Sequence, residues 1–155
     1  MPLTIRPLRP DEHGAWLVFR RALWPDVDEA THAFEIAEHS TRGDANAAVL
    51  VAEADGGALA GFVELSVRER VDGSMEERVG YLEGWYVAPE WRGHGVGRAL
   101  VEAGEAWTRA RGLRELASDA EIENEGSIAA HRALGFRETF RVVQFLKRLE
   151  EWGGG

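Results

Sequence analysis

The stretch Val87–Glu105, VAPEWRGHGVGRALVEAGE, joins a predicted strand to a predicted helix through three alternating glycines. Glycine costs conformational entropy in any regular element, so such a cluster needs a physical reason. A turn that leads into a helix presents unpaired backbone N–H groups, and the helix dipole adds partial positive charge there. The stretch therefore predicts an anion site at a helix N-terminus, and phosphate is its natural ligand.

Two common phosphate-binding motifs do not match this loop. A Walker A loop requires Gly-Lys-Ser/Thr after the glycines, and that sequence is missing. A dinucleotide-binding fingerprint has a later glycine and lies at a first strand–helix turn, whereas this GxGxG run lies deep in the chain. A tight turn without a ligand remains an alternative, although three glycines between two arginines exceed what a turn needs.

Upstream of the loop, alternation of polar and apolar residues predicts strands, and periodic apolar residues predict helices. A first helix opens at Pro10 and ends at Pro25, and a second begins near Asp28. Turns are predicted at 55–57 (DGG) and 72–74 (DGS). The expected strands are 3–9, 47–54, 58–71 and 78–87.

Downstream, a helix is expected over 95–111, followed by a strand over 113–120 and a helix over 127–134. A last strand is expected over 136–149. The strand–helix–strand unit over 78–119 implies a parallel strand pair within an otherwise antiparallel sheet. We expect one mixed α/β domain over residues 1–150 and a disordered tail over 151–155.

The composition of the chain restricts the classes of ligand that the protein is expected to bind. The 155-residue chain has a net charge of −9, and residues 25–90 hold four basic against fifteen acidic side chains. This acidic third disfavours nucleic acid and attracts a cationic ligand, while a solvated acidic surface is the alternative. The chain has no cysteine and no histidine pair at a metal-ligand spacing, so no metal is expected. No membrane-spanning run or signal peptide is evident, so we expect a cytoplasmic protein.

The run Arg92-Gly-His-Gly-Val-Gly97, with Asn124 ahead of AAHRALGF, resembles the GCN5-related N-acetyltransferase (GNAT) superfamily. The resemblance implies a mostly antiparallel sheet with a central, splayed parallel strand pair flanked by helices. It implies acetyl-coenzyme A as co-substrate, with pantetheine in the splay and the thioester oxygen facing an amide near Val87. The implied coenzyme contacts are Tyr86, Val87, Arg92, Gly93, His94, Gly95, Val96, Gly97, Arg98 and Asn124.

A narrower resemblance, to aminoglycoside 6′-N-acetyltransferases, rests on RALWPD (21–26), YLEGWYV (81–87), ASDA (117–120) and GFRET (135–139). It implies that Glu83, Asp119 and Glu138 contact the cationic sugar amines, and that Trp24 forms a wall of the sugar pocket. The substrate amine must lose a proton before it attacks the thioester in a ternary complex. Glu83 and Asp119 are both candidate bases.

Structural roles remain open alternatives for these residues. Glu83 could pair with Arg68 or Arg78 across strands, and Asp119 could cap the turn that follows it. Similarly, Glu138 could lie on the surface and Trp24 in the core.

Two positions depart from the family pattern. His131 stands where many members have a tyrosine that protonates the leaving thiolate. Histidine can act as that acid near neutral pH, or it can be a helix-surface residue. In the strand before the 72–74 turn, Arg68, Glu69 and Arg70 replace an aromatic residue that the aminoglycoside group often carries, which changes the expected stacking surface.

The sequence leaves three other functions open. The protein could acetylate a polyamine, an amino-acid derivative or a protein N-terminus, or it could bind acetyl-coenzyme A as a sensor without turnover. It could also be an acidic interaction protein that binds no coenzyme. By resemblance we expect a homodimer, with the apolar run Val142–Leu146 contributing to its interface.

Overall fold

The computed structural model describes residues 2–150, so the prediction of a disordered tail at 151–155 lies outside the described residues. The strands are β1 (Leu3–Pro7), β2 (Ala47–Ala54), β3 (Leu59–Glu69), β4 (Arg78–Val87) and β5 (Leu116–Ser118). The α-helices are α1 (His13–Leu23), α2 (Glu29–Ser40), α3 (Val96–Ala110) and α4 (Glu125–Ala133). Short 3₁₀ turns occupy Pro10–Glu12, Asp55–Gly57 and Pro89–Trp91.

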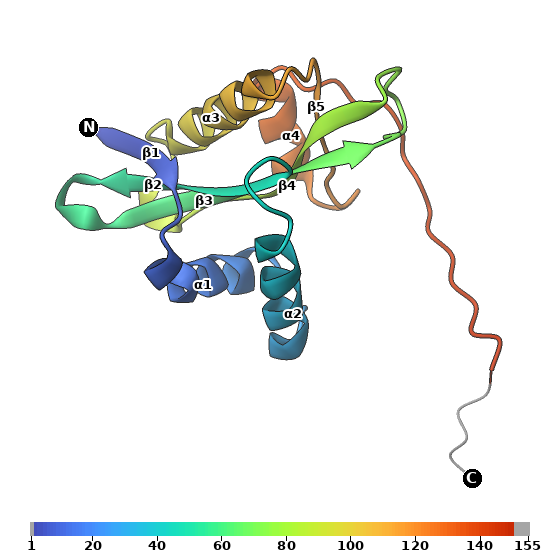
Figure 1. Cartoon of the computed structure of the whole chain (residues 1–155), viewed down its shortest axis with the longest axis horizontal. Helices are drawn as coiled ribbons and strands as arrows, with labels where there is room; N and C mark the ends of the chain where they lie inside the picture. The colour runs from blue at the N-terminus through green and yellow to red at the C-terminus, as the bar shows by residue number, and fades with distance from the viewer. Residues whose placement is uncertain (1, 151–155) are drawn as a thin grey trace, which may run out of the picture.

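The five strands form one sheet in the order β1-β2-β3-β4-β5. Neighbouring strands are antiparallel from β1 to β4, and β5 runs parallel to β4, which confirms the predicted mixed sheet. Helices α1 and α2 cover one face of the sheet and α3 covers the other (Figure 1). Among the described residues, no helix combines the length and apolar character needed to cross a bilayer.

Each face of the sheet buries its own apolar cluster. On the α3 side, Val96, Leu100 and Val101 pack against strand residues such as Val63 and Leu65. These helix positions follow the 3.6-residue period that predicted α3 from the sequence. On the α1 side, Trp16 and Phe19 pack on β2 and β3. The two clusters fix the sheet between its helices and hold the end of β4 next to the start of α3.

A buried ion pair ties α1 to the centre of β3. The guanidinium of Arg20 and the carboxylate of Glu64 lie 2.5 Å apart, and both side chains are almost fully buried. The indole of Trp16 donates a further 2.6 Å hydrogen bond to Glu64. A buried charge is tolerated only when it is paired and hydrogen-bonded, so this cluster fixes α1, and Trp24 at its end, over the sheet.

The segment after α4 departs from the sequence prediction. A strand is expected over residues 136–149, but these residues form no strand in the described structure. Phe136 still packs on the α3-side core and Thr139 lies beside Gly73, and beyond them the chain runs away from the body of the fold (Figure 1). A strand requires a paired edge, and within residues 2–150 β5 pairs only with β4. The parallel pair β4–β5 therefore lies at the edge of the sheet rather than at its centre, and β5 is shorter than the predicted 113–120.

Candidate active site

The glycine loop has the geometry of an anion cradle. Gly93 and Gly95 both have a φ of +80°, in the left-handed region that favours glycine. Within residues 2–150, none of the amides of residues 93–98 donates to a backbone carbonyl, because the first helical bond runs from Ala99 to Gly95. A Cβ at Gly93 or Gly95 would meet no protein atom within 4 Å, so no protein group crowds the loop at these two positions. The loop therefore fits a phosphate group.

The third glycine of the loop has a different role. A Cβ on Gly97 would lie 3.2 Å from Cζ2 of Trp85, so any larger residue at this position would press on the Trp85 ring and push α3 or the ring aside. The absence of a side chain at Gly97 thus serves packing, while its amide belongs to the unpaired run. Arg92 supports the loop from the other side by donating a 2.9 Å hydrogen bond from Nε to the Val87 carbonyl.

Beyond the loop, β4 has a free edge. The β4–β5 pairing covers Gly80–Leu82 and Leu116–Ser118 and ends there, so within residues 2–150 no strand pairs with the rest of β4 on that side, up to Val87. Ala88 donates its amide to Ala60 of β3. Since hydrogen-bonded positions alternate along an antiparallel pair, the Val87 amide faces away from β3 and into the splay. An extended ligand can add to this edge as a further strand would.

Glu83 lies at an irregularity of β4. The register between β3 and β4 shifts there, so that Leu65 pairs with Leu82 and Glu64 with Gly84, and Glu83 is the extra residue of a bulge. Bulges often redirect side chains next to active sites. The Glu83 carboxylate accepts hydrogen bonds from Ser66 Oγ at 2.6 Å and from Arg68 Nε at 2.7 Å.

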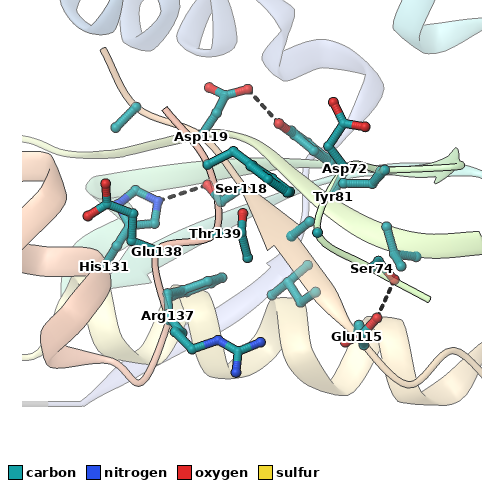
Figure 2. A pocket seen from close by; sticks show the side chains of 18 of the residues that line it. Asp72, Ser74, Tyr81, Glu115, Ser118, Asp119, His131, Arg137, Glu138 and Thr139 are labelled. Carbon is teal, nitrogen blue, oxygen red and sulfur yellow. Dashed lines mark hydrogen bonds between the residues drawn. The ribbon is translucent and has the colours of Figure 1, made fainter. Parts of the chain in front are cut away.

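Asp119 lies one residue beyond β5, on the same side of the sheet as Tyr81. The Tyr81 hydroxyl donates a 2.6 Å hydrogen bond to Asp119 Oδ2 (Figure 2). Burial raises the pKa of the Tyr81 hydroxyl well above its usual range, and the hydrogen bond to Asp119 raises it further. Tyr81 therefore keeps its proton at physiological pH and acts as a donor that orients Asp119.

The expected substrate residues are divided between two cavities. A cavity of about 690 Å³ is lined by Trp24 and Glu83, together with Arg68, Glu35 and Glu64. Trp24 lies over Gly84, whose Cβ would be 2.8 Å from the indole ring. Trp24 therefore lines this cavity with its ring over Gly84, and its role as a wall of the sugar pocket stays a prediction.

A second cavity, of about 1390 Å³, is lined by Tyr81, Asp119, His131 and Glu138, and Arg68 also reaches it. Glu138 pairs with Arg132 and Arg141, which together lower the pKa of its carboxyl, Arg141 having the larger effect. The structure thus brings Glu83 and Asp119 together around Arg68 and Tyr81, whereas Glu138 lies on the separate segment that follows α4.

His131 projects from α4 toward the splay between β4 and β5. Its Nδ1 lies 2.7 Å from the Ser127 carbonyl, which can only accept, so Nδ1 carries a proton. Its Nε2 lies 2.8 Å from Ser118 Oγ (Figure 2), and that hydroxyl is 3.2 Å from the Leu82 carbonyl. The ring packs edge-on against Trp85. His131 is therefore a fixed, hydrogen-bonded group and not a loose surface side chain.

Asn124 is the N-cap of α4, where its side-chain oxygen accepts from the Ser127 amide at 3.0 Å. Sequence reasoning missed Tyr81, Ser66 and Ser118 as parts of the site. Tyr81 could have been found, because it precedes Glu83 by two residues and a strand places such residues on one face.

A family model described as "Acetyltransferase (GNAT) family" matches residues 13–136. The chain belongs to the GNAT acetyltransferase family. A protein named aminoglycoside N(6′)-acetyltransferase type 1 from Stenotrophomonas maltophilia is 48% identical to this GNAT chain over 148 residues, which cover 95% of this chain and 94% of that protein. A protein of the same name from Klebsiella aerogenes is 44% identical, covering 94% of this chain and 96% of that one.

Solved structures agree with this assignment. The crystal structure of aminoglycoside antibiotic 6′-N-acetyltransferase AAC(6′)-Ih from Acinetobacter baumannii has a TM-score of 0.86 to this GNAT chain, with 36% identity and coverage of 96% of this chain and 100% of that chain. AAC(6′)-Iy in complex with a bisubstrate analog, CoA-S-monomethyl-acetylneamine, also has a TM-score of 0.86, at 35% identity, and covers 96% and 99% of the two chains.

Proposed function

We propose that this enzyme transfers the acetyl group of acetyl-coenzyme A to the 6′-amine of aminoglycosides. The observation that carries the proposal is the 48% identity, over nearly the full length of both chains, to a relative named for that activity. Supporting it, a cavity lined by Trp24 and by glutamates that are each paired with an arginine gives a polycationic sugar carboxylates to bind in exchange for those arginines. Such an activity would confer aminoglycoside resistance on a cell that expresses the enzyme.

Acetyl-coenzyme A fits the loop and the splay. The unpaired amides of residues 93–98 would hold its diphosphate, and the free edge of β4 would bind the pantetheine arm. Bound acetyl-coenzyme A supplies the acetyl group as a thioester. The Val87 amide, fixed by the Arg92 contact to the Val87 carbonyl, is the donor that stabilises negative charge on the thioester oxygen. Tyr86, His94, Arg98 and Asn124 are proposed as further coenzyme contacts.

The two carboxylates supply the chemistry on the amine side. An ammonium that enters between Glu83 and Asp119 is held by charge, and one of the two, directly or through water, accepts the proton that must leave before attack. Glu83 is oriented by Ser66 and Asp119 by Tyr81, so both are positioned for this role. Trp24 forms the wall of the pocket, and Glu138 binds a more distant amine.

His131 is proposed as the acid that protonates the leaving thiolate, through Ser118. When His131 is charged, its Nε2–H donates to Ser118 Oγ while that hydroxyl donates to the Leu82 carbonyl. When His131 is neutral, the Ser118 hydroxyl donates to Nε2 instead. For the transfer, the Ser118 hydroxyl would turn from the Leu82 carbonyl to the thiolate, give its own proton to the sulfur and take the Nε2 proton of charged His131, which leaves a neutral His131 and an intact Ser118 hydroxyl.

Two rival functions give different results in one assay. Acetyl transfer is measured with the purified protein against a panel of an aminoglycoside with a 6′-amine, a polyamine and a peptide with a free N-terminus. We expect kcat/KM to be highest for the aminoglycoside by ~100-fold or more, because only that substrate combines several amines for the glutamates of the cavity with a sugar ring that can lie against Trp24. Higher kcat/KM for the polyamine or the peptide would support another amine substrate, and acetyl-coenzyme A binding without turnover would support a sensor.

The homodimer is also proposed, on the basis of the segment after α4. Phe145 and Leu146 are 91% and 100% exposed, which is costly for large apolar side chains in water. The cavity of about 1390 Å³ lies along β5, where the sheet edge has no neighbour within residues 2–150. We propose that residues 141–149 of a second copy pair with β5 and cover these side chains. A cytoplasmic location, where acetyl-coenzyme A is available, completes the proposal.

Light scattering tests the dimer. At micromolar concentration we expect twice the monomer mass of 17.2 kDa for the intact chain. The double substitution Phe145→Asp/Leu146→Asp should give a monomer, because two charges cannot be buried against β5 without partners. Lys147→Asp, which changes the charge beside them without removing apolar area, is the control. A monomer for the intact chain would exclude the proposed dimer.

A further inference from the structure

The side chain of Arg68 lies where the proposed function places the amine of the substrate. Its guanidinium pairs with the Glu83 carboxylate through two nitrogens, one contact being 2.7 Å from Nε to Oε1. The same guanidinium carbon lies 3.6 Å from the centre of the Tyr81 ring. Tyr81 in turn holds Asp119. A cation thus lies on an aromatic face between two carboxylates.

These are the contacts that a protonated amino sugar would need in the same place. An ammonium is stabilised by a carboxylate within about 4 Å and by the face of an aromatic ring. Glu83 and Tyr81 offer both, and in the free protein Arg68 uses both. Arg68 also lines both cavities, so it lies where the two halves of the substrate pocket meet.

We propose that Arg68 is an internal cation that occupies the ammonium position of the free enzyme and that a substrate amine must displace. This inference rests on the proposed function, because it takes the cavity beside Glu83 as the amine-binding pocket. Arg68 is then a selectivity residue. The net binding free energy of an incoming amine is the difference between its own contacts with Glu83 and Tyr81 and the Arg68 contacts that it displaces.

The burial of the pair permits such an exchange. The side chain of Arg68 is 44% exposed and long, so its guanidinium can swing into solvent. Glu83 is only 20% exposed and needs a partner, because a partly buried carboxylate without one is costly. Replacement of one cation by another leaves Glu83 paired throughout. Glu35 and Glu38 also line this cavity, and each is paired with an arginine and partly exposed. A substrate with several amines can exchange these pairs as well, whereas a monoamine exchanges only one, so Arg68 favours substrates with several amines.

The test uses the full-length enzyme with Arg68→Gln, Arg68→Lys and the control Arg78→Gln. Arg78 lies on the neighbouring strand and contacts Asn46 rather than a carboxylate, so its substitution removes the same charge without freeing Glu83. We expect Arg68→Gln to lower KM for an aminoglycoside by about 5- to 10-fold, the range for removing one competing, partly exposed ion pair. Arg68→Lys, which keeps the charge but loses the two-nitrogen contact, should give an intermediate KM.

Binding is measured separately by calorimetry with the aminoglycoside alone, which does not depend on turnover. Affinity should rise in Arg68→Gln by the same factor and stay within about 2-fold in Arg78→Gln. If Arg68→Gln raises KM and weakens binding while the wild type acetylates the aminoglycoside, Arg68 positions Glu83 and the displacement model is wrong, although the function stands. If the wild type binds the aminoglycoside without acetylating it, tighter binding to Arg68→Gln still supports the displacement model.

A wild type that neither binds nor acetylates the aminoglycoside would refute the proposed function and this inference together. Circular dichroism verifies that each variant is folded, and Arg68→Lys carries the test alone if Arg68→Gln does not fold.

Discussion

Gly95→Asp is expected to lower the affinity for coenzyme A by ~100-fold or more in a protein that still folds. The new carboxylate would lie at the start of α3, beside the unpaired amides and in a position that no protein atom crowds, and would repel the diphosphate. Two unit charges about 4 Å apart repel by on the order of 4 kcal/mol near a protein surface. Each ~1.4 kcal/mol is a factor of about ten in the dissociation constant, so the full repulsion corresponds to ~1,000-fold. The expected loss is smaller, ~100-fold or more, because the aspartate side chain can turn away and relieve part of the repulsion.

The fold is expected to survive because aspartate tolerates the left-handed region better than most residues, and a Cβ at Gly95 contacts no other atom. Gly95→Asn is the matched control, since it has nearly the same shape and backbone preference without the charge. Calorimetry with coenzyme A should show a loss in the aspartate variant that is at least ten times the loss in the asparagine variant. Equal affinity of wild type and a folded Gly95→Asp protein would mean that the loop does not hold the diphosphate.

Glu83→Gln and Asp119→Asn are each expected to lower kcat/KM for an aminoglycoside by ~10- to 1,000-fold. This is the range for losing a positioned base or a close ion pair. Both substitutions keep the shape of the side chain and remove its charge. Affinity for acetyl-coenzyme A should change little, because the coenzyme is proposed to bind along the loop and the edge of β4.

The kinetic parameters separate the two possible roles of the carboxylates. A residue that only binds the cation should raise KM and leave kcat nearly unchanged. A base should lower kcat, and the loss should shrink as the pH rises and more of the substrate amine is already deprotonated. Glu77→Gln is the control, since it removes one charge from the same acidic third of the chain outside both cavities. Wild-type kinetics for both variants across the pH range would contradict the assignment of this pocket.

Local sequence patterns predicted most elements because local rules set them. The alternation and turns around β2 and β4 matched the observed Ala47–Ala54 and Arg78–Val87, and Asp28 caps α2 as its position before the helix suggested. The helix after the glycine loop followed from its apolar period. These features depend on residues a few positions apart.

Features that depend on distant strands could not be predicted in the same way. The bulge that exposes Glu83 is set by the register between β3 and β4, which no local pattern encodes. The sequence offered Arg68 and Arg78 as partners for Glu83, and only the observed register selects Arg68. The alternative of Asp119 as a turn cap was also open, and the structure shows that it accepts from Tyr81 instead.

The segment after α4 shows a second reason why a local pattern can predict the wrong structure. Its alternating apolar residues predict a strand, and the pattern is real, yet a strand forms only where an edge is available to pair with it. Within the described residues no such pairing occurs for residues 136–149. The alternating pattern indicates that the segment favours a strand, but it does not indicate which other strand this one would pair with.

The most direct test of the central claim is the position of the acetyl group on the product. The enzyme is incubated with acetyl-coenzyme A and a matched pair of aminoglycosides, one with a 6′-amine and one with a 6′-hydroxyl in its place, and the products are examined by NMR. We expect acetylation of the first compound at the 6′-nitrogen and a kcat/KM at least ~1,000-fold lower for the second, because a hydroxyl cannot form the ammonium that pairs with the carboxylates. Acetylation at another amine, or equal rates for the two compounds, would contradict the central claim.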